Sequence, residues 1–476
     1  MESGLSNFFK CKVSAPHNFI FHLFYDTYKS KKRNLAFPDF KNNSNFAIIC
    51  NLAKPKPKLY MKRYIFRTTL LLLVAANIYS CKSDKRNNGP VTIDVEGAVG
   101  NYTVGKLSDY LQDIRYIKLE TNDSSLLGDI SDIYYECGFL YISDANDCCK
   151  IFDDKGKFIR SIKRVGRGPE EYCEIRNISV NPSNGNLFIL TATGEIVEYK
   201  ITGEFVRRFS SPEGLGAPFG FMPLNSDTFF ISTFKFQNGN TPENCYAIID
   251  NSLNVLRSGS DLNGYVLSSA GSPASVITID PYNIYRYGTD FYTSQTGNDT
   301  ILRIQIDSSY KLTPHIIFNL GKYKDESVRS VMPDKAFEKK VITKYSVLFE
   351  TKDNIFIKFD LRALAPEPFE RSTEMSFPGN GPVEMNTTVC GIYDKKRERL
   401  SLLKQPVKRR SGLKDDIKGG PVFWPVFSTS RGELITYYNA VSLITMAEEE
   451  GENYPGLSQI IGNLGENDNP VIAIAR

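Results

Sequence analysis

The chain has 476 residues, of which 58 are Lys or Arg and 54 are Asp or Glu, so its formal net charge at pH 7 is +4. This total combines segments of opposite sign, because residues 1–60 hold ten basic and three acidic residues, whereas residues 81–476 hold 45 basic and 51 acidic ones. The long C-terminal part is therefore net acidic. This part lacks the net positive charge that favours nucleic-acid binding, the basic clusters at 395–397 and 408–410 are interpreted as solvated turns or strand edges, and we expect no nucleic-acid partner.

A secretory signal begins at Met61. Lys62 and Arg63 open a basic segment, and an apolar run of about twelve residues follows over 68–79. This run is too short for a membrane span, which needs about twenty residues, and has the length of a signal peptide. It ends in Ile-Tyr-Ser-Cys, which resembles a bacterial lipobox. We interpret 61–80 as a lipoprotein signal peptide and Cys81 as the lipid-modified membrane anchor; the alternative is an uncleaved N-terminal anchor.

The segments on either side of this signal have different expected fates. Residues 1–60 precede a complete signal peptide and show no sustained apolar period. We interpret them as a misassigned upstream extension, with translation starting at Met61. Residues 81–90 are polar, a composition that stays disordered, and we expect them to tether the following domain to the membrane.

Short strands with period-2 apolar spacing dominate the rest of the chain. Val91–Val95 and Ile114–Leu119 come first. Four more strands then follow within about 35 residues, separated by turns rich in Gly, Asp and Asn, which indicates an antiparallel meander. We expect these four strands at residues 130–135, 139–143, 149–152 and 158–162.

The next four strands repeat this unit. We expect them at residues 178–180, 186–190, 196–199 and 205–209. The segment KIFDDKGKFIRSI at 150–162 recurs as VEYKITGEFVRRF at 197–209, so that Gly156 corresponds to Gly203, 47 residues later. A repeat of this length indicates supersecondary units stacked side by side.

Weaker units continue to the end of the chain, and four-stranded meanders repeated about an axis make a β-propeller. We predict an all-β, six-bladed β-propeller of four-stranded antiparallel blades over 91–476, with five or seven blades and a solenoid as alternatives. Val91–Val95 and Pro470–Ala475 are the candidates for closing the ring. Apolar residues at i, i+3, i+4 and i+7 over 457–464 predict a short helical segment near the C-terminus.

Several phrases carry a resemblance to known proteins. ISDANDCCKIFDDKGKFI at 142–159 resembles the NHL-type repeat, and the chain as a whole resembles a family of six-bladed β-propeller lipoproteins of Gram-negative bacteria. The further matching phrases are YIKLET at 116–121, VGRGPEEY at 165–172, DDIKGGPVFWP at 415–425 and ENDNPVIAIAR at 466–476. The resemblance implies six blades and a location in the cell envelope, which we expect to be the outer membrane, and it implies no particular chemistry.

Six of the nine cysteines lie in the predicted propeller, and none has CxxC spacing. A domain of this size has enough core to fold without disulfides, so we expect buried thiols. The exception we consider is a bridge from Cys137 to Cys148 or Cys149 across one hairpin.

The loop VGRGPEEY contains the candidate binding residues. Its glycines and Pro169 predict an irregular loop between the first two blades, which would expose Arg167, Glu170 and Glu171. The alternative is a purely structural turn, and the similar NGPVEM at 380–385 favours it.

Motifs of catalysis and metal binding are missing. Asp144–Asp147 has the composition of a calcium loop but lacks its Gly and terminal Glu, so we interpret it as a turn. His315 is the only histidine after residue 60, which excludes a zinc site built on several histidines. No GxSxG, HExxH or P-loop occurs, and a single tryptophan, Trp424, excludes the repeated Asp-boxes of sialidases. We expect no catalytic residue, metal or cofactor.

Two functions follow from these patterns. The leading hypothesis is a lipid-anchored propeller of the cell envelope that binds a ligand or an envelope protein without catalysis. The alternative is a hydrolase or lyase acting on a glycan, lactone or peptide, with acidic residues brought to the central channel from several blades.

Overall fold

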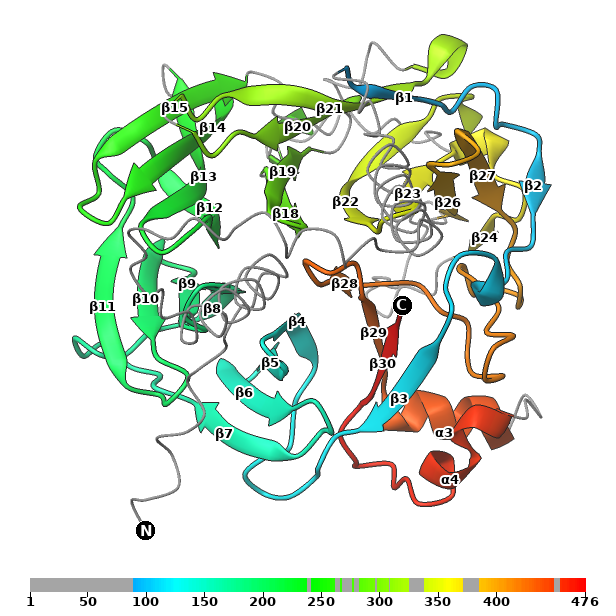
Figure 1. Cartoon of the computed structure of the whole chain (residues 1–476), viewed down its shortest axis with the longest axis horizontal. Coiled ribbons are helices and arrows are strands. Elements are labelled where there is room, and N and C mark those ends of the chain that lie inside the picture. Colours follow the sequence, from blue (N-terminus) through cyan, green and yellow to red (C-terminus); the bar gives the residue numbers. More distant parts are fainter. Residues whose placement is uncertain are drawn as a thin grey trace, which may run out of the picture. The chain divides into compact units, whose positions relative to one another are not determined.

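The protein is described by a computed structural model that covers residues 89–237, 241–261, 266–267, 276–277, 282–295, 298–307, 309–324, 338–370, 385–448 and 454–476. These residues form a six-bladed β-propeller, as predicted, with sheets of four or five strands arranged as blades around a central axis (Figure 1). Two further pairs of short strands lie outside the blades: β16 (Val266–Leu267) with β17 (Val276–Ile277), and β24 (Phe369–Glu370) with β25 (Met385–Asn386).

The first three blades are consecutive four-stranded meanders whose first strand is innermost. Blade 1 contains β4 (Ile130–Glu136), β5 (Phe139–Asp144), β6 (Cys148–Asp153) and β7 (Phe158–Ile162). Blade 2 contains β8 (Ile175–Val180), β9 (Leu187–Thr191), β10 (Glu195–Tyr199) and β11 (Phe205–Ser210). Blade 3 contains β12 (Ala217–Pro223), β13 (Thr228–Gln237), β14 (Thr241–Asp250) and β15 (Val255–Asp261).

The other three blades also take strands from the N-terminal part of the chain. Blade 4 contains β18 (Asn283–Tyr287), β19 (Asp290–Ser294), β20 (Thr300–Ile304), β21 (Leu312–Asn319) and β1 (Val91–Asp94). Blade 5 contains β22 (Thr343–Glu350), β23 (Asn354–Asp360), β26 (Thr388–Asp394), β27 (Arg399–Leu403) and β2 (Tyr102–Thr103). Blade 6 contains β28 (Phe427–Ser428), β29 (Leu434–Tyr438), β30 (Val471–Ala475) and β3 (Ile114–Lys118).

Apolar residues on both faces of the middle strands hold the blades together. Every residue of β9 and β30 is buried, because each blade packs against a neighbour on either side. The main hydrophobic clusters follow this pattern, with one cluster at each of the six junctions between adjacent blades. Burial of this kind supplies the main favourable free energy of folding.

The 47-residue repeat is confirmed as one blade step. Gly156 lies in the turn between β6 and β7, and Gly203 lies in the matching turn between β10 and β11, with φ angles of 84° and 80°. Gly156 is also closely approached, since a Cβ atom there would lie 2.5 Å from the carbonyl oxygen of Lys118. The first glycine therefore serves both the turn and the packing of blade 1 against β3.

Residues 91–118 run along the outer edges of three blades, and we call them the N-terminal belt (Figure 1). β1 pairs in parallel with β21, β2 pairs in parallel with β27, and β3 pairs antiparallel with β30. The closing strand is therefore Ile114–Lys118, not Val91–Val95 as one of our predictions proposed. The other predicted closing segment is confirmed, because β30 lies in the sixth blade and pairs with β3.

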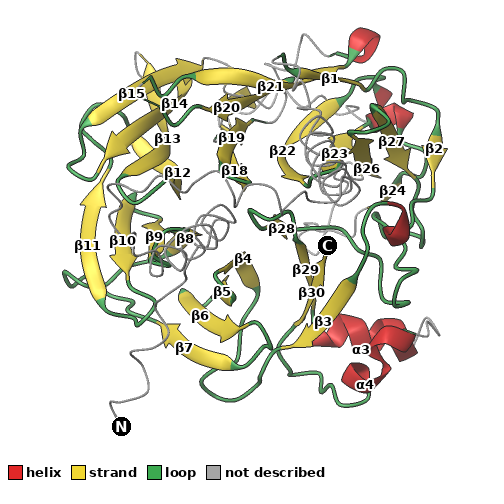
Figure 2. Ribbon diagram, viewed as in Figure 1, coloured by secondary structure: helices red, strands yellow, loops and turns green. Residues whose placement is uncertain are grey.

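The helical segment predicted near the C-terminus is present beside blade 6 (Figure 2). Over the predicted residues it is only a 3₁₀ turn, η6 (Pro455–Leu457), and α4 (Ser458–Ile461). The longer α3 (Ala440–Glu448) was not predicted. Further 3₁₀ turns are η2 (Leu107–Asp109), η3 (Gly321–Tyr323) and η5 (Arg362–Leu364). Within the described ranges, no helix has the length and apolar character that crossing a bilayer requires.

The proposed bridge from Cys137 to Cys148 or Cys149 is wrong. Cys137 lies in the turn before β5, whereas Cys148 and Cys149 begin β6 at the other end of β5. That length of strand separates the two ends by roughly 17 Å, against the 4.4–6.8 Å between Cα atoms that a disulfide allows. The thiols of Cys148 and Cys149 are free and buried, as we expected for the cysteines of the propeller.

Candidate functional site

The innermost strands of all six blades surround one cavity of about 450 Å³. Its wall is formed by residues of β4, β8, β12, β18 and β22, and by β28 with the residues beside it. This volume lies within the roughly 300–1,000 Å³ that is usual for sites that bind small molecules. The central channel of the propeller is therefore the candidate functional site.

Alternating residues of β4 point three side chains into the channel. Asp132, Tyr134 and Glu136 all line it, as expected for positions i, i+2 and i+4 of a strand. A β-bulge interrupts the pairing of β4 with β5 between Ile130 and Asp132. Bulges commonly redirect a side chain next to a site, and this one precedes the channel-lining carboxylates.

Asp132 joins blade 1 to blade 2. Its Oδ2 accepts hydrogen bonds from the side-chain amide of Asn177 at 2.7 Å and from the backbone N–H of Ile178 at 3.2 Å. Its Oδ1 accepts a third from the N–H of Ile133 at 3.0 Å. Burial raises the pKa of Asp132 to about 6, against the lowering effect of these three donors. The carboxyl group therefore changes charge close to neutral pH.

This raised pKa gives a testable dependence on pH. A carboxyl group with a folded-state pKa of about 6 binds its proton more readily when folded than when unfolded, where the pKa is near 4. Lowering the pH from 6 to 4 should therefore stabilise the wild type relative to Asp132→Asn, by about 1 to 3 kcal/mol. Urea denaturation at a series of pH values measures the difference, and the exposed Asp154→Asn should show no such change.

Glu136 and Arg286 meet across the channel. Glu136 ends β4 of blade 1 and Arg286 lies on β18 of blade 4, and the Nη1 of Arg286 is 3.7 Å from Glu136 Oε2. This distance makes an ion pair but exceeds that of a hydrogen bond. Burial raises the pKa of Glu136, and the charges of Arg286 and Arg431 act in the opposite direction. At the same end, the N–H of Gly288 donates to the carbonyl oxygen of Ser430 at 2.8 Å.

Aromatic and apolar groups fill much of the remaining wall. The guanidinium of Arg176 lies over the ring of Phe219, 4.3 Å from its centre, near the end of the channel that holds Asp132. Val347 and Val426 also line the channel and keep 49% and 46% of their surface exposed. The channel therefore offers an apolar surface together with a few charged groups.

The predicted loop at residues 165–172 lies away from this cavity. Glu171 accepts a hydrogen bond from the N–H of Gly168 at 2.8 Å, and Glu170 pairs with Arg164 at 2.5 Å. A further hydrogen bond joins the hydroxyl of Tyr199 to the carbonyl oxygen of Glu170 at 2.6 Å. These contacts agree with the alternative of a structural turn.

Arg167 differs from its neighbours in this loop. Its side chain is exposed, and no hydrogen bond or ion pair joins it to another residue of the described part of the chain. Its role in binding stays a prediction, as do those of Glu170 and Glu171. Cys81, the predicted lipid anchor, lies outside the described residues.

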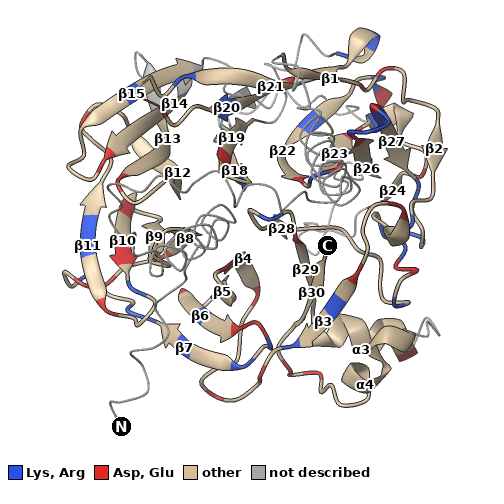
Figure 3. Ribbon diagram, in the orientation of Figure 1, with Lys and Arg blue, Asp and Glu red and all other residues tan. Residues whose placement is uncertain are grey.

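The loop is held against blade 2, whose two outer strands carry matched charges. Figure 3 shows acidic segments on β10 beside basic segments on β11. Arg207 pairs with Glu198 at 2.7 Å, and Arg208 pairs with Glu195 at 3.1 Å. Arg208 also donates to the carbonyl oxygen of Gly168, so the outer edge of blade 2 supports the loop.

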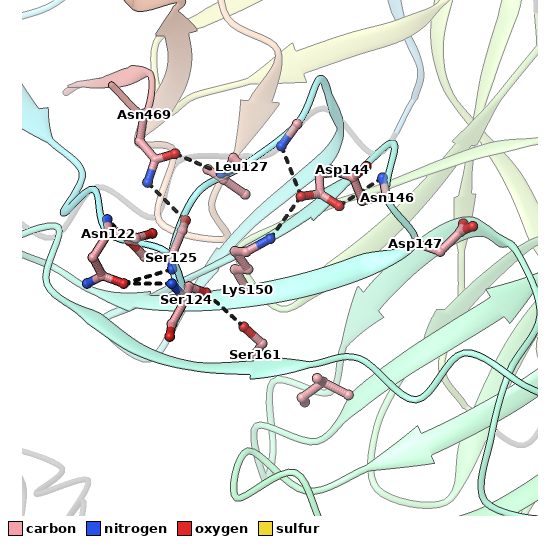
Figure 4. Close-up of polar contacts among 12 residues, drawn as sticks. Asn122, Ser124, Ser125, Leu127, Asp144, Asn146, Asp147, Lys150, Ser161 and Asn469 are labelled. Atoms are coloured by element: carbon pink, nitrogen blue, oxygen red, sulfur yellow. Dashed lines mark hydrogen bonds and ion pairs between the residues drawn. The ribbon is translucent and has the colours of Figure 1, made fainter. Parts of the chain in front are cut away.

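Asp144–Asp147 is a structural turn, as interpreted from the sequence. The carboxylate of Asp144 accepts hydrogen bonds from the ammonium of Lys150, at 3.0 Å, and from the backbone N–H groups of Gly128 and Asn146 (Figure 4). Asp147 accepts one from the N–H of Ile175. Among the described residues, no group of three or more His, Cys, Asp or Glu side chains could hold a metal ion.

Two other predicted features also belong to the scaffold. Asp415 is buried and accepts hydrogen bonds from Ile417, Lys418 and Gly420 and from the hydroxyl of Tyr116, which fixes the turn after it. Trp424 packs in the hydrophobic cluster between blades 5 and 6. These residues explain the phrase DDIKGGPVFWP as a structural element.

His315 lies in a buried polar cluster between blades 4 and 5. Its Nε2 is 3.2 Å from Oε2 of Glu350, which also accepts a hydrogen bond from Tyr285 and pairs with Lys395 at 2.7 Å. Burial would raise the pKa of Glu350, but His315 and Lys395 outweigh it and hold that pKa below its usual value. All four residues join two blades, and we assign the cluster a structural role.

Comparison with known proteins places the chain in a family. Residues 90–476 match a family model described as a domain of unknown function, DUF4934. The chain belongs to this DUF4934 family. No curated protein matches the chain.

One of the similar solved structures supports the fold. A "Putative exported protein" from Bacteroides fragilis shares 16% identity with a TM-score of 0.56, over 82% of this chain and 99% of its own. A member of the DUF4221 family from Bacteroides vulgatus shares 12% identity over 61% of this chain and 84% of its own, with a TM-score of 0.31. The protein U3-55K shares 10% identity over 78% of this chain and 100% of its own, with a TM-score of 0.36. Only the first likeness is high enough to support an inference, and it concerns the fold of the DUF4934 chain.

The channel residues were missed by the sequence analysis. Asp132 lies inside a predicted strand, Glu136 was assigned to the turn after that strand, and no strand was predicted around Arg286; the three residues form no local motif. A signal was nevertheless present in ISDIYYE and NIYRY, where charged residues interrupt short, aromatic strands. Charges inside the first strand of a propeller repeat indicate the channel, because that strand is innermost.

Proposed function

We propose that this DUF4934 protein is a non-catalytic binding module of the cell envelope, anchored by a lipid on Cys81, and that its ligand binds in the central channel. The supporting observation is that the innermost strands of all six blades converge on one cavity of about 450 Å³ that carries charged, aromatic and apolar groups. The envelope location is supported by the lipobox-like sequence and by the description of the similar Bacteroides fragilis protein as exported. A binding partner among envelope proteins would meet the exposed Arg167 loop.

The enzyme alternative finds less support in the geometry. Asp132 and Glu136 are the carboxylates among the described residues of the channel wall, and they lie four residues apart on β4. Their spacing along the strand is about 13 Å, beyond the roughly 5–9.5 Å between the two carboxyl groups of most glycoside hydrolases. Asp132 is also engaged by three donors that join two blades.

The proposed ligand site can be tested with a substitution that fills the channel. Val347→Trp places a large side chain at an exposed position of the channel wall, while Val255→Trp does so at an exposed position on β15, outside the channel. Each purified protein is incubated with a methanol extract of cells, washed and examined by mass spectrometry for bound small molecules. We expect a compound that the wild type and Val255→Trp retain and Val347→Trp loses. Equal retention by all three proteins would contradict a ligand site in the channel.

The anchor has its own test. Labelling with palmitate should mark the wild-type protein and fail to mark Cys81→Ala, because a lipobox directs the lipid to that cysteine. Equal labelling of the two proteins would contradict the lipoprotein interpretation. Peptides from residues 1–60 in the cellular protein would likewise contradict a translation start at Met61.

A further inference from the structure

We propose that the ligand of the channel carries a carboxylate group that binds Arg286, with an apolar body that extends toward Phe219, Val347 and Val426. This inference rests on the proposed function, since it names the class of ligand that the channel would bind. It follows from the state of one arginine, from the carboxylate beside it and from the apolar wall.

Arg286 has unused hydrogen-bonding capacity inside the channel. Its Nε and Nη1 are buried and have no hydrogen-bond partner among the described residues. Its guanidinium lies 5.7 Å from the centre of the Phe291 ring, on the neighbouring strand of the same blade. A buried donor without an acceptor is unfavourable, more so in a charged group, so a ligand that supplies an acceptor removes this penalty on binding.

The existing carboxylate does not satisfy this arginine. Glu136 lies 3.7 Å from Nη1, so it offsets the charge without making a hydrogen bond. Arg431, in the turn after β28, contributes a second positive charge that acts on Glu136. This end of the channel therefore holds the ion pair of Arg286 and Glu136, and the exposed Arg431 adds positive charge near it. A carboxylate fits the flat fork of a guanidinium through two parallel hydrogen bonds, which a neutral group cannot match.

The apolar body of the ligand is inferred from the rest of the wall. Val347 and Val426 lie on adjacent blades, line the channel, and are each nearly half exposed. Phe219 is covered on one side by Arg176. An apolar group placed against these side chains would remove their apolar surface from water, which favours binding.

The experiment compares acids with their uncharged amides. Hexanoate, octanoate, decanoate and 3-phenylpropionate, each beside its primary amide, are titrated into the purified protein by isothermal titration calorimetry. We expect at least one acid to bind at least about tenfold more tightly than its amide. Arg286→Gln should weaken binding of that acid by about 10- to 100-fold, since a hydrogen bond to a charged group contributes about 1.5–3 kcal/mol.

A second variant separates this role from a structural one. Glu136→Gln removes the carboxylate that competes with the ligand for Arg286. It should therefore strengthen binding of the acid by about tenfold and leave binding of the amide unchanged. Arg399→Gln, on the outer part of blade 5, is the control and should change the affinity for neither the acid nor its amide. If Arg286→Gln fails to fold, Arg286→Lys can replace it. This variant keeps the charge but should still weaken binding of the acid, because lysine lacks the flat, two-pronged guanidinium group.

The outcomes also distinguish this inference from the proposed function. If acids and amides bind equally, or if no acid binds, the carboxylate class is wrong. A small molecule retained by the wild type and lost by Val347→Trp would still support ligand binding in the channel. If neither experiment detects a ligand that depends on the channel, both proposals fail.

Discussion

Replacing Lys150 with methionine is expected to lower the free energy of unfolding by about 3 to 5 kcal/mol. Lys150 and Asp144 form an ion pair of 3.0 Å whose side chains are 8% and 0% exposed. Burial would raise the pKa of Asp144, but hydrogen bonds from Gly128 and Lys150 outweigh it and hold that pKa low, so the carboxylate is charged at neutral pH. The substitution leaves this charge buried and unpaired. Chemical denaturation of both proteins measures the loss.

Two variants test the cause of that loss. Lys157→Met changes an exposed lysine of the same blade and should have little effect. The double variant Asp144→Asn with Lys150→Met removes both charges, and we expect it to be clearly more stable than Lys150→Met alone. If the double variant were as unstable as the single one, the loss would come from packing of the lysine and not from the unpaired carboxylate.

Asn469→Ala should cost about 3 kcal/mol, because one side chain satisfies three backbone groups of the loop between β3 and β4. Its Nδ2 donates to the carbonyl oxygen of Ser125, and its Oδ1 accepts the N–H of Leu127 at 2.8 Å (Figure 4). The same Nδ2 also donates to the carbonyl oxygen of Glu120. Asn469 is 1% exposed, so water cannot easily replace these bonds. Thermal unfolding should show a clear decrease in Tm.

Asn467 is the matched control for this prediction. It lies two residues earlier, is exposed, and forms no side-chain hydrogen bond with other described residues. Asn467→Ala should therefore leave Tm nearly unchanged. Equal decreases in the two variants would mean that the segment before β30 is sensitive to any substitution, and that the hydrogen bonds of Asn469 are not the cause.

The blades could be predicted because their signals are local. Each hairpin turn needs Gly, Asp or Asn at a particular place, and the strands between turns are short and apolar, as in the repeat of Gly156 and Gly203. Ring closure could not be predicted in the same way. Val91–Asp94 and Ile114–Lys118 are both short strands, and period-2 spacing shows which face a residue takes but not which edge the strand joins.

The channel was harder to predict for a different reason. Glu136 and Arg286 are far apart in sequence, and they come within 3.7 Å of each other only because the six inner strands share one axis. The loop at residues 165–172 attracted attention by its composition, yet its glutamates bind their own neighbours. Composition identifies an irregular loop, whereas a site assembled from six strands leaves only single charges in otherwise apolar segments.

The N-terminal belt determines when this domain can become complete. Ile114 pairs with Ala475, so the closing strand is among the first parts of the domain to be synthesised and its partner is the last. At 5–20 residues per second, roughly 20 to 70 s separate the two during translation. β1 and β2 can pair earlier, once β21 and β27 have been synthesised, so blade 6 is the blade that waits for the end of the chain. Loss of the final six residues, which contain β30, would therefore leave β3 without a partner and β29 paired with β28 alone, and the ring would stay open even with almost all of the chain present.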